Sequence, residues 1–360
     1  MSDYKLEVQS LFRKYNIQII KNFENYLINY NLEKTIFIID SKVDELYKNK
    51  IDLSLISTRI LKIDASEDAK SMKNSIFFID KLIDLNVKRN DTIVAIGGGV
   101  VQDIAAFIAS ILFRGINWHF YPTTLLAQAD SCIGSKSSIN FRKYKNLIGT
   151  FCPPSKIFTD LQFLNTLTKQ EIKSGIGEIL HYYFTDGIDL AKQLSNDYEL
   201  LLKNTSKLTF YIFKSLEIKK KIIELDEFDT KIRHIFNYGH TFGHAIESIT
   251  NYKIPHGQAI TIGMDLANFI SLKLGMLEQD LFSEMHTILE KNMPVFIFDE
   301  NNIGDYLLAL AKDKKNIGNQ LGCILTRGPG KMEKKFINID EELKILILTY
   351  SDIYLKKIII

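Results

Sequence analysis

The feature that most constrains the fold is a short apolar run that ends at three consecutive glycines. The residues Thr92-Ile-Val-Ala-Ile96 lead directly into Gly97-Gly98-Gly99, and an apolar helical segment follows. An uninterrupted apolar run, as opposed to an alternating one, is typical of a strand buried on both faces of a parallel sheet. The order of strand, glycine turn and helix therefore predicts one repeat of a parallel α/β sheet.

The first third of the chain repeats this pattern. Two further strand-like runs, Thr35–Asp40 and Ile60–Asp64, come before Thr92, and the segments Val43–Asn49 and Ala65–Leu85 have helical spacing. Strands that alternate with helices favour a doubly wound α/β domain. We therefore predict an N-terminal Rossmann-like domain with a parallel sheet over residues 1–167.

The pattern changes near Leu164–Lys169, after which helical spacing dominates. The expected helices are Lys169–Phe184, Ala191–Leu202, Lys207–Leu225, Lys231–Asn251 and Gly257–Leu274. Gly322–Thr326 is a candidate short strand near the C-terminus. The sequence thus predicts a second, mostly α-helical domain over residues 168–360.

Composition agrees with a two-domain globular protein. The chain has 360 residues, of which 46% are apolar and 24% charged, so a disordered, collagen-like or coiled-coil protein is excluded. The net charge is only +2, which argues against a nucleic-acid partner. Three scattered cysteines are too few for a disulfide framework, and a reducing cytoplasm is the expected location.

Neither a signal peptide nor a membrane segment is expected. The N-terminus lacks an apolar signal core. The longest apolar stretch, Ile104–Phe113, is far shorter than the about 20 residues that a spanning helix needs. We therefore expect no membrane partner and a small molecule as the ligand.

The three glycines are also a candidate nucleotide site. A backbone without Cβ atoms lets a pyrophosphate approach closely, and the free N–H groups at the start of the next helix attract its charge. The pattern differs from Gly-x-Gly-x-x-Gly, so a tight strand-to-helix turn without a ligand is the alternative.

Three histidines and a glutamate form a candidate metal site. His240 and His244 are four residues apart in a helical stretch and so share one face, and His256 opens the next such stretch. Glu178 lies on an apolar helix, where a carboxylate needs a partner. One glutamate and two histidines would form a zinc site with an open position. The alternatives are a metal bound by both His240 and His244, or histidines that are structural.

Two further groups of polar residues are candidate site residues, and the first of them suits a pocket for an anionic, hydroxyl-rich ligand. The first follows Pro122 within an otherwise apolar region and comprises Thr123, Thr124, Asp130, Lys136, Asn140, Lys145 and Asn146. The second is Lys219 with Arg233, Asn237, His240 and His244, of which the last four are spaced as one continuous helical face. The alternatives are a solvated loop for the first group and a basic solvent-exposed stripe for the second.

These motifs resemble the 3-dehydroquinate synthase family over nearly the whole chain, from about Asp40 to about Thr326. The segments that carry the resemblance are Phe113–Gly115, Pro122–Lys136, Lys145–Gly149, Arg233–Glu247 and His256–Ala259. The wider group, the sugar phosphate cyclases, shares its fold with iron- and zinc-dependent polyol dehydrogenases. The resemblance therefore implies a dehydroquinate synthase-like fold, in which the N-terminal domain (1–167) binds NAD and the C-terminal helical domain (168–360) binds the metal and the substrate.

The resemblance also implies a lyase of the shikimate pathway that uses NAD and a divalent metal, zinc or cobalt, and acts as a homodimer. Its substrate would be 3-deoxy-arabino-heptulosonate 7-phosphate, which is oxidised, loses phosphate, is reduced and closes to a carbocycle by an aldol addition. In such a reaction a metal polarises the reacting oxygens and lysines stabilise enolate-like charge.

Site residues follow from the resemblance, position by position. The metal ligands would be Glu178, His240 and His256. The catalytic and pocket residues would be Asp130, Lys136, Lys219, Arg233, Asn237 and His244, with Asn146, His181 and a neighbouring subunit's Arg114 as further substrate contacts. The NAD contacts would be Asp40, Glu67, Lys70, Gly98, Gly99, Val100, Asp103, Thr123, Thr124, Lys145, Phe163, Thr166, Leu167 and Glu171.

Three departures from the family's usual residues concern the substrate. The usual Gly-Gly-Lys-Thr reads Gly134-Ser-Lys-Ser137, and a pocket lysine is replaced by His181. Gly322 aligns loosely with a basic residue that commonly holds the phosphate, a role that Lys314, Lys315 or Lys331 could take. The alternatives to dehydroquinate formation are a divergent cyclase with another sugar phosphate, a metal-dependent polyol dehydrogenase, and a non-catalytic homologue with a decayed site.

Overall fold

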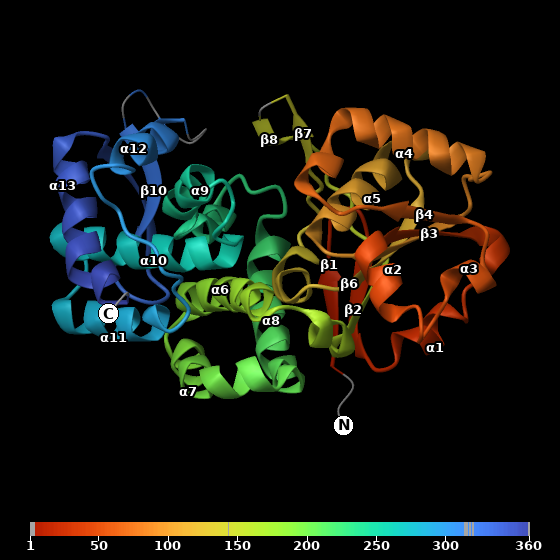
Figure 1. Ribbon diagram of the computed structural model, residues 1–360, viewed down its shortest axis with the longest axis horizontal. Coiled ribbons are helices and arrows are strands. Elements are labelled where there is room, and N and C mark those ends of the chain that lie inside the picture. Colours follow the sequence, from red (N-terminus) through yellow and green to blue (C-terminus); the bar gives the residue numbers. More distant parts are fainter. Residues whose placement is uncertain (1–3, 143, 313–315, 317, 319, 359–360) are drawn as a thin grey trace. The chain divides into compact units, whose positions relative to one another are not determined.

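The chain forms two compact units in the computed structural model, which describes residues 4–142, 144–312, 316, 318 and 320–358 (Figure 1). The first unit comprises Met1–Thr168 and Thr205–Phe228, and the second comprises Lys169–Asn204 and Asp229–Ile360. The segment Thr205–Phe228 thus packs with the first unit, although its helical pattern placed it in the second domain. Periodicity marks a helix but does not identify the surface against which the helix packs.

The first unit is built on a seven-stranded sheet in the order β1-β2-β9-β6-β5-β3-β4. All neighbouring strands are parallel except β1 and β2, which form an antiparallel hairpin at one edge. The strands are β1 (Lys5–Gln9), β2 (Lys14–Ile20), β3 (Thr35–Asp40), β4 (Ile60–Ile63), β5 (Thr92–Gly97), β6 (Asn117–Pro122) and β9 (Lys156–Asp160). The predicted parallel α/β domain is confirmed.

Both faces of this sheet are buried, which explains the uninterrupted apolar runs. Phe37 and Ile39 of β3 join the core on the face that carries Phe23 and Tyr47. Side chains alternate along a strand, so the buried Ile36 and Ile38 point to the opposite face. The helices of this unit are α1 (Phe23–Leu27), α2 (Ser41–Tyr47), α3 (Leu53–Ile56), α4 (Met72–Asp84), α5 (Gly99–Ile111) and α8 (Leu208–Leu225).

Shorter elements complete the first unit. The strands β7 (Ile139–Phe141) and β8 (Tyr144–Ile148) form a separate antiparallel hairpin. This unit also has short helical segments, which are η1 (Leu32–Lys34), η2 (Glu67–Lys70), η3 (Leu112–Arg114), η4 (Ala127–Ser131), η5 (Leu161–Thr166) and η6 (Thr205–Lys207). The turn η4 is π-helical, a form that often marks functional sites.

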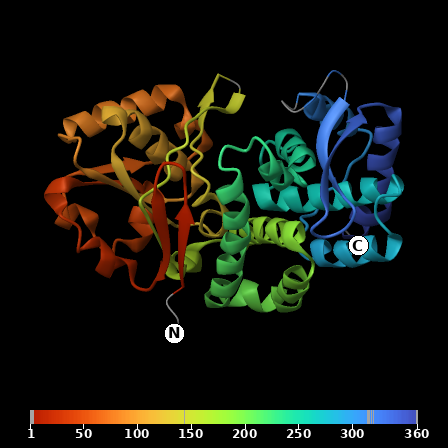
Figure 2. The ribbon, with the colours of Figure 1, turned by 180° about the vertical axis from the view of Figure 1, so that it is seen from behind.

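The second unit is mostly helical, as predicted. Its helices are α6 (Lys169–Asp186), α7 (Asp189–Lys203), α9 (His240–Ile249), α10 (His256–Lys273), α11 (Gln279–Glu290), α12 (Ile303–Ala311) and α13 (Glu341–Tyr350), with the turns η7 (Ile232–Asn237), η8 (Ser351–Leu355) and η9 (Lys356–Ile358). Helix α10 is buried along nearly its whole length and packs against α6 and α9. Strands β10 (Gln320–Thr326) and β11 (Met332–Asn338) form an antiparallel hairpin, drawn in blue in Figure 2.

One predicted helix is wrong. Lys231–Asn251 is not continuous, because the 3₁₀ turn η7 ends at Asn237 and α9 begins only at His240. Gly239 between them has φ +75°, and a Cβ atom on it would lie 2.8 Å from the backbone nitrogen of Met264 on α10. Arg233 and Asn237 therefore do not share a continuous helical face with His240 and His244. Periodicity alone could not reveal this break.

None of the helices in the described part of the chain has the length and apolar character needed to cross a bilayer.

Candidate active site

The predicted cofactor residues of the first unit gather at the carboxyl edge of its parallel sheet. Asp40 ends β3, Gly98 follows β5, and Thr123 and Thr124 follow β6. The segments after β4 and β9 carry five more of them, which are Glu67, Lys70, Phe163, Thr166 and Leu167. In open α/β sheets this edge is where ligands bind.

The glycine turn after β5 leaves the start of α5 open. Gly98 is the N-cap of α5, and without a side chain it cannot cap the first amides of the helix. A Cβ atom on Gly99 would meet nothing within 4 Å, whereas one on Gly98 would lie 3.0 Å from the side chain of Thr124. The N–H groups of Gly99 and Val100 thus begin a 13-residue helix at the sheet edge, an arrangement suited to a phosphate.

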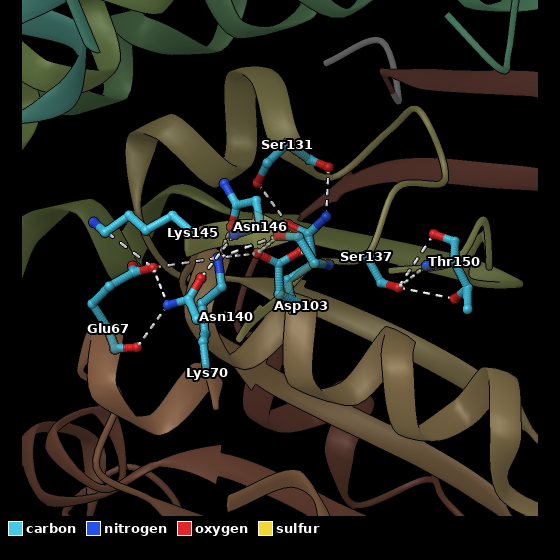
Figure 3. A network of polar contacts seen from close by, with 11 residues as sticks. Glu67, Lys70, Asp103, Ser131, Ser137, Asn140, Lys145, Asn146 and Thr150 are labelled. Carbon is cyan, nitrogen blue, oxygen red and sulfur yellow. Dashed lines mark hydrogen bonds and ion pairs between the residues drawn. The ribbon is translucent and has the colours of Figure 1, made fainter. Parts of the chain in front are cut away.

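A polar network ties the β7–β8 hairpin to this edge (Figure 3). The buried ammonium of Lys70 lies 2.7 Å from the Asp103 carboxylate and donates to Oδ1 of Asn146 at 2.9 Å. Asn140 donates to the Glu67 carboxylate at 2.8 Å, and its own carbonyl accepts the backbone N–H of Asn146. Side chains expected to contact NAD or phosphate therefore bond to one another here.

Lys145 belongs to the rim of the same network. It is exposed on β8, and its ammonium lies 3.8 Å from the Glu67 carboxylate. Figure 3 shows it beside Glu67 and away from Asp103.

In the same unit, Asp130 orients the buried ammonium of Lys219. Lys219 on α8 donates to both the carboxylate and the backbone carbonyl of Asp130, each at 2.8 Å. Ser215, one turn earlier on α8, donates to the carbonyl of Ala129 at 2.9 Å. The π-helical turn η4 is thus fixed to α8 at two successive residues. Lys136 lies farther along the chain in an exposed position.

Arg114 lies at the opposite edge of the sheet. It follows α5 and directly precedes β6, so it sits at the amino edge of the sheet. It is exposed, and its φ of +63° places it in the left-handed region together with Phe113 and Gly115. Within its own unit Arg114 is therefore far from the cofactor residues at the carboxyl edge.

The predicted metal ligands converge in the second unit. Glu178 comes from α6, His240 begins α9 and His256 begins α10. Oε1 of Glu178 lies 3.6 Å from Nε2 of His240 and 3.0 Å from Nε2 of His256. The side chain is almost fully buried, and this oxygen has no hydrogen-bond partner among the described residues.

These distances fit a divalent metal. Ligands about 2.0–2.1 Å from a tetrahedral zinc lie about 3.3 Å from one another. The imidazoles are also oriented correctly, since Nδ1 of His256 donates to Glu247 at 3.0 Å and Nδ1 of His240 donates to the carbonyl of Tyr238 at 3.2 Å. When the imidazoles are neutral, each Nε2 is therefore the atom that carries the lone pair, as expected for metal-binding histidines with outer hydrogen-bond partners.

His244 completes the cluster on its solvent side. Its ring nitrogen belongs to a set with His240 and His256 in which all ligand atoms lie within 4.8 Å of one another. His244 is exposed, whereas Glu178 is 1% exposed. Glu178 is thus the inner group, and His244 is the group that an incoming molecule would meet first.

The electrostatics of the cluster favour a cation. Burial lowers the pKa of His256, but the Glu247 and Glu178 carboxylates outweigh it and raise that pKa well above its ordinary value. Burial, together with the neighbouring imidazoles, lowers the pKa of His240. The site therefore combines two carboxylates that attract positive charge with a neutral imidazole that can serve as a ligand.

Glycines next to the ligands let the three helices meet. A Cβ atom on Gly177 would lie 2.0 Å from the carbonyl oxygen of Gly257, and one on Gly257 would lie 1.8 Å from that of Ser174. On the α9 side, a Cβ atom on Gly263 would lie 2.1 Å from the carbonyl oxygen of Gly239. Backbone contact of this kind brings Glu178, His240 and His256 within reach of one metal.

His181 lies close to the metal-ligand cluster. Its side chain is fully buried, its Nδ1 lies 3.9 Å from the Glu178 carboxylate, and its ring centre is 4.9 Å from that of His240. Its ring also stacks near Tyr238. The expectation of a substrate contact at this position remains a prediction.

The remaining predicted residues of the second unit lie on η7, α6, β10 and the segments beside β10 in the sequence. Arg233 is buried and Asn237 half-buried on η7, and Glu171 is half-buried in the first turn of α6. Gly322 is buried in β10, and its carbonyl accepts from Thr241, the residue after His240, at 3.4 Å. Lys331 is exposed, and Lys314 and Lys315 lie outside the described residues.

Glu247 is the functional residue that the sequence analysis missed. It ends the segment Arg233–Glu247 that carries the family resemblance, but the sequence alone assigns it no role. The signal was present, because Glu247 is seven residues after His240 and therefore lies on the same face of α9.

Comparisons with known proteins agree with this geometry. Two family profiles match consecutively, 3-dehydroquinate synthase N-terminal over residues 60–174 and 3-dehydroquinate synthase C-terminal over residues 175–316. The 3-dehydroquinate synthase of Thermoanaerobacter sp. (strain X514) is 37% identical over 319 residues, which is 87% of this chain and 90% of that protein.

Two solved structures of cyclases are also similar. A 2-deoxy-scyllo-inosose synthase complexed with carbaglucose-6-phosphate, NAD+ and Co2+ has a TM-score of 0.85 at 25% identity, over 96% of this chain and 99% of that chain. The 2-epi-5-epi-valiolone synthase of Streptomyces hygroscopicus with NAD+ and Zn2+ bound has a TM-score of 0.80 at 25% identity, over the same shares. On the strength of both profiles and of its identity to curated members, the chain belongs to the 3-dehydroquinate synthase family.

Proposed function

We propose that the chain is an NAD- and metal-dependent sugar phosphate cyclase that converts 3-deoxy-arabino-heptulosonate 7-phosphate into 3-dehydroquinate and phosphate. The observation that carries the proposal is the convergence of Glu178, His240 and His256 on one point, in a chain of the dehydroquinate synthase family. When bound, NAD supplies reversible hydride transfer and the metal supplies a Lewis acid for the substrate oxygens.

Glu178, His240 and His256 would hold the metal, with Glu247 orienting His256. A set of three protein ligands leaves a position open for substrate oxygens. His244 would contact the substrate from the solvent side of the cluster. Arg233 would pair with the substrate carboxylate, because its planar fork matches a carboxylate in bidentate fashion.

The carboxyl edge of the sheet in the first unit would hold NAD. The first amides of α5 would bind the pyrophosphate, and Asp40 at the end of β3 would accept from a ribose hydroxyl. Burial raises the pKa of Asp40 above its ordinary value. The oxygens of a carboxyl group accept hydrogen bonds from hydroxyls. The other cofactor contacts would be Glu67, Lys70, Gly98, Gly99, Val100, Asp103, Thr123, Thr124, Lys145, Phe163, Thr166, Leu167 and Glu171.

Lys136 and Lys219 would stabilise negative charge that develops on the substrate. The double hydrogen bond from Lys219 to Asp130 fixes the direction of its ammonium before a substrate arrives. Asn146 would reach the phosphate, and Asn237 would complete the substrate contacts.

A second candidate is a cyclase that acts on a different sugar phosphate. The observation that favours it is His181, which is fully buried against Glu178 and His240 where the family usually has a pocket lysine. An imidazole at this position removes a permanent charge from the surroundings of the metal. A His181→Lys variant that leaves the substrate preference unchanged would argue against this second candidate.

The decisive experiment measures phosphate release from the heptulosonate phosphate with NAD and zinc present, and identifies the product by mass and NMR. Phosphate together with dehydroquinate and no net NADH supports the first proposal. Net NADH would instead indicate a polyol dehydrogenase. Protein that binds neither zinc nor cobalt, and is not rescued by either, would indicate a decayed site. If metal and NAD bind without turnover, heptulose and hexose phosphates should be screened.

The position of Arg114 supports a homodimer. It lies at the amino edge of the sheet, opposite the cofactor residues of its own unit, so a role at the phosphate requires the Arg114 of a second copy. Light scattering on the purified protein would measure the oligomeric state. Mixing inactive Arg114→Ala and Lys219→Ala subunits should restore part of the activity if Arg114 acts across subunits.

The three cysteines, Cys132, Cys152 and Cys323, are free thiols. Free thiols persist in a reducing compartment. We therefore propose a cytoplasmic location, which fractionation of the source cells would test.

A further inference from the structure

The turn that presents Lys136 has an unusual backbone conformation. Ser135 has a φ of +65°, in the left-handed region that favours glycine, and the N–H of Lys136 donates to the carbonyl of Gly134 at 2.8 Å. A hydrogen bond from the N–H of residue i+2 to the carbonyl of residue i, with a positive φ at the residue between them, is typical of the rarer kind of γ-turn. This turn is strained. A serine stays in such a conformation only where its surroundings hold it.

Backbone contacts hold this turn on one side. The carbonyl of Ser135 accepts the N–H of Cys152 at 2.7 Å, and the N–H of Ser137 donates to the carbonyl of Thr150 at 2.8 Å. The hydroxyls of Ser137 and Thr150 lie 2.9 Å apart (Figure 3). The residues on both sides of Lys136 are therefore tied to the segment 150–152.

The side chain of Ser135 is held from the other side by Glu227. The Ser135 hydroxyl donates to Oε1 of Glu227, and the same oxygen accepts from the hydroxyl of Ser10 at 2.6 Å. The other oxygen, Oε2, accepts the backbone N–H of Leu11 at 2.8 Å. Both Ser135 and Glu227 are 7% exposed.

Glu227 thereby joins three parts of the first unit. It follows α8, the helix that carries Lys219, and its carboxylate binds the turn between β1 and β2 as well as the Lys136 turn. A carboxylate is suited to this place because it only accepts hydrogen bonds, and three donors face it. Bonds to a charged acceptor are stronger than those between neutral groups.

We propose that Glu227 and Ser135 form a latch that positions Lys136 for the reaction. The latch holds Ser135 in its left-handed conformation and so fixes where the backbone of Lys136 lies, while the flexible ammonium remains exposed. Glu227 is a positioning residue, because it acts through Ser135 and not on the substrate. The proposal rests on the proposed function in one respect, namely that Lys136 stabilises negative charge on the sugar phosphate substrate.

The test uses five variants of the full chain. Glu227→Gln keeps the shape of the side chain but replaces one acceptor oxygen by a donor. Ser135→Ala removes the hydroxyl and retains a Cβ atom at φ +65°, whereas Ser135→Gly removes both the hydroxyl and the strain. The fourth variant combines Glu227→Gln with Ser135→Gly. The matched control is Glu224→Gln, since Glu224 also accepts a backbone N–H from the end of β1, that of Gln9 at 2.7 Å, but is exposed.

Two readouts separate the latch from the proposed function. Amide hydrogen exchange of peptides that cover residues 132–152 reports the turn whatever the substrate is. Phosphate release from the heptulosonate phosphate gives kcat and KM. Thermal unfolding and NAD binding identify variants that have lost the fold of the first unit.

The latch predicts faster exchange of these peptides in Glu227→Gln and Ser135→Ala and unchanged exchange in Glu224→Gln. It predicts a roughly 10- to 100-fold loss of kcat/KM in the first two variants, because a displaced catalytic group costs about this much. Ser135→Gly should stay near the wild-type kcat/KM, and the double variant should be no worse than Ser135→Gly. If Glu227 merely stabilises the fold, adding Ser135→Gly should not restore the kcat/KM that Glu227→Gln loses.

Unchanged hydrogen exchange in both Glu227→Gln and Ser135→Ala would overturn the latch. It would also be overturned if the double variant lost as much kcat/KM as Glu227→Gln and Ser135→Gly lose together. A wild-type protein with no phosphate release would overturn the proposed function instead, and the exchange data would still decide on the latch.

Discussion

Gly257 on α10 lies so close to Gly177 on α6 that a Cβ atom on Gly177 would be 2.0 Å from the Gly257 carbonyl oxygen. The two glycines directly adjoin His256 and Glu178. The distance between the helices and the distance between the two ligands are therefore set by the same contact.

The first prediction is that Gly257→Ala abolishes tight zinc binding. The added methyl group would meet the carbonyl of Ser174 at 1.8 Å, and backbone atoms on both helices cannot move aside without separating Glu178 from His256. Zinc content per chain, measured by elemental analysis after dialysis, should fall close to zero. Gly304→Ala is the control, because a Cβ atom there would meet nothing within 4 Å. Full zinc content in Gly257→Ala would contradict the argument.

The second prediction concerns Glu247, which accepts from Nδ1 of His256 at 3.0 Å. Removing such an outer partner usually costs 10- to 100-fold in metal affinity, so we expect a loss of about this size in Glu247→Gln. Competition with a chromogenic chelator would measure it. Glu290→Gln is the matched control, since Glu290 lies 3.5 Å from another histidine, His286, and is exposed. Equal affinities in the two variants would show that Glu247 does not orient the ligand.

The third prediction is that Lys70→Met destabilises the first unit. The Lys70 ammonium is buried and lies 2.7 Å from the Asp103 carboxylate, so its removal leaves a largely buried charge without this partner. We expect a loss of about 2–3 kcal/mol in the free energy of unfolding by urea. Lys81→Met should change it by less than about 0.5 kcal/mol, because the Lys81–Asp84 pair is exposed. A similar small change for Lys70→Met would mean that Asp103 readily finds other partners.

The fourth prediction is a pH dependence from His119. Burial, followed by the nearby Lys156 and Arg13, lowers the pKa of His119 to about 4. The folded state thus keeps this imidazole neutral at pH values where the unfolded chain, with a pKa near 6.5, binds a proton. The contribution of His119 to stability is therefore present above about pH 6.5 and is lost as the pH falls toward 4. The shift corresponds to a loss of roughly 3 kcal/mol.

Subtracting the unfolding free energy of His119→Gln from that of the wild type at each pH isolates this effect from other acid-sensitive groups. The difference should fall between pH 7 and pH 4. His286→Gln should give the opposite trend, because burial lowers the pKa of His286 but its bond to Asp265 raises it overall. Stabilisation by His286 is then present below about pH 6.5 and is lost as the pH rises through its folded pKa. A His119 difference that does not fall between pH 7 and pH 4 would contradict the first assignment, and a His286 difference that falls over the same range would contradict the second.

Much of the fold followed from local patterns in the sequence. The uninterrupted apolar runs at Thr35–Asp40 and Thr92–Ile96 coincide with β3 and β5, because only a strand covered on both faces tolerates apolar side chains in both directions. The end of a parallel strand also fixes which edge of the sheet its next residues reach. The placement of Asp40 and Gly98 at one edge therefore followed once these two strands were identified. The strand before Thr123, β6, was not predicted from the sequence.

Tertiary structure alone decided the rest, because it depends on contacts between segments distant in sequence. The break at Gly239 exists because α10 leaves no room for a Cβ atom, and nothing in the spacing from Arg233 to His244 reveals it. The role of Glu247 requires His256 to lie opposite it on another helix. The left-handed conformation of Ser135 likewise needs Glu227, 92 residues later, to hold it. Residue types determined which chemistry this protein can hold, and packing determined which of those residues meet.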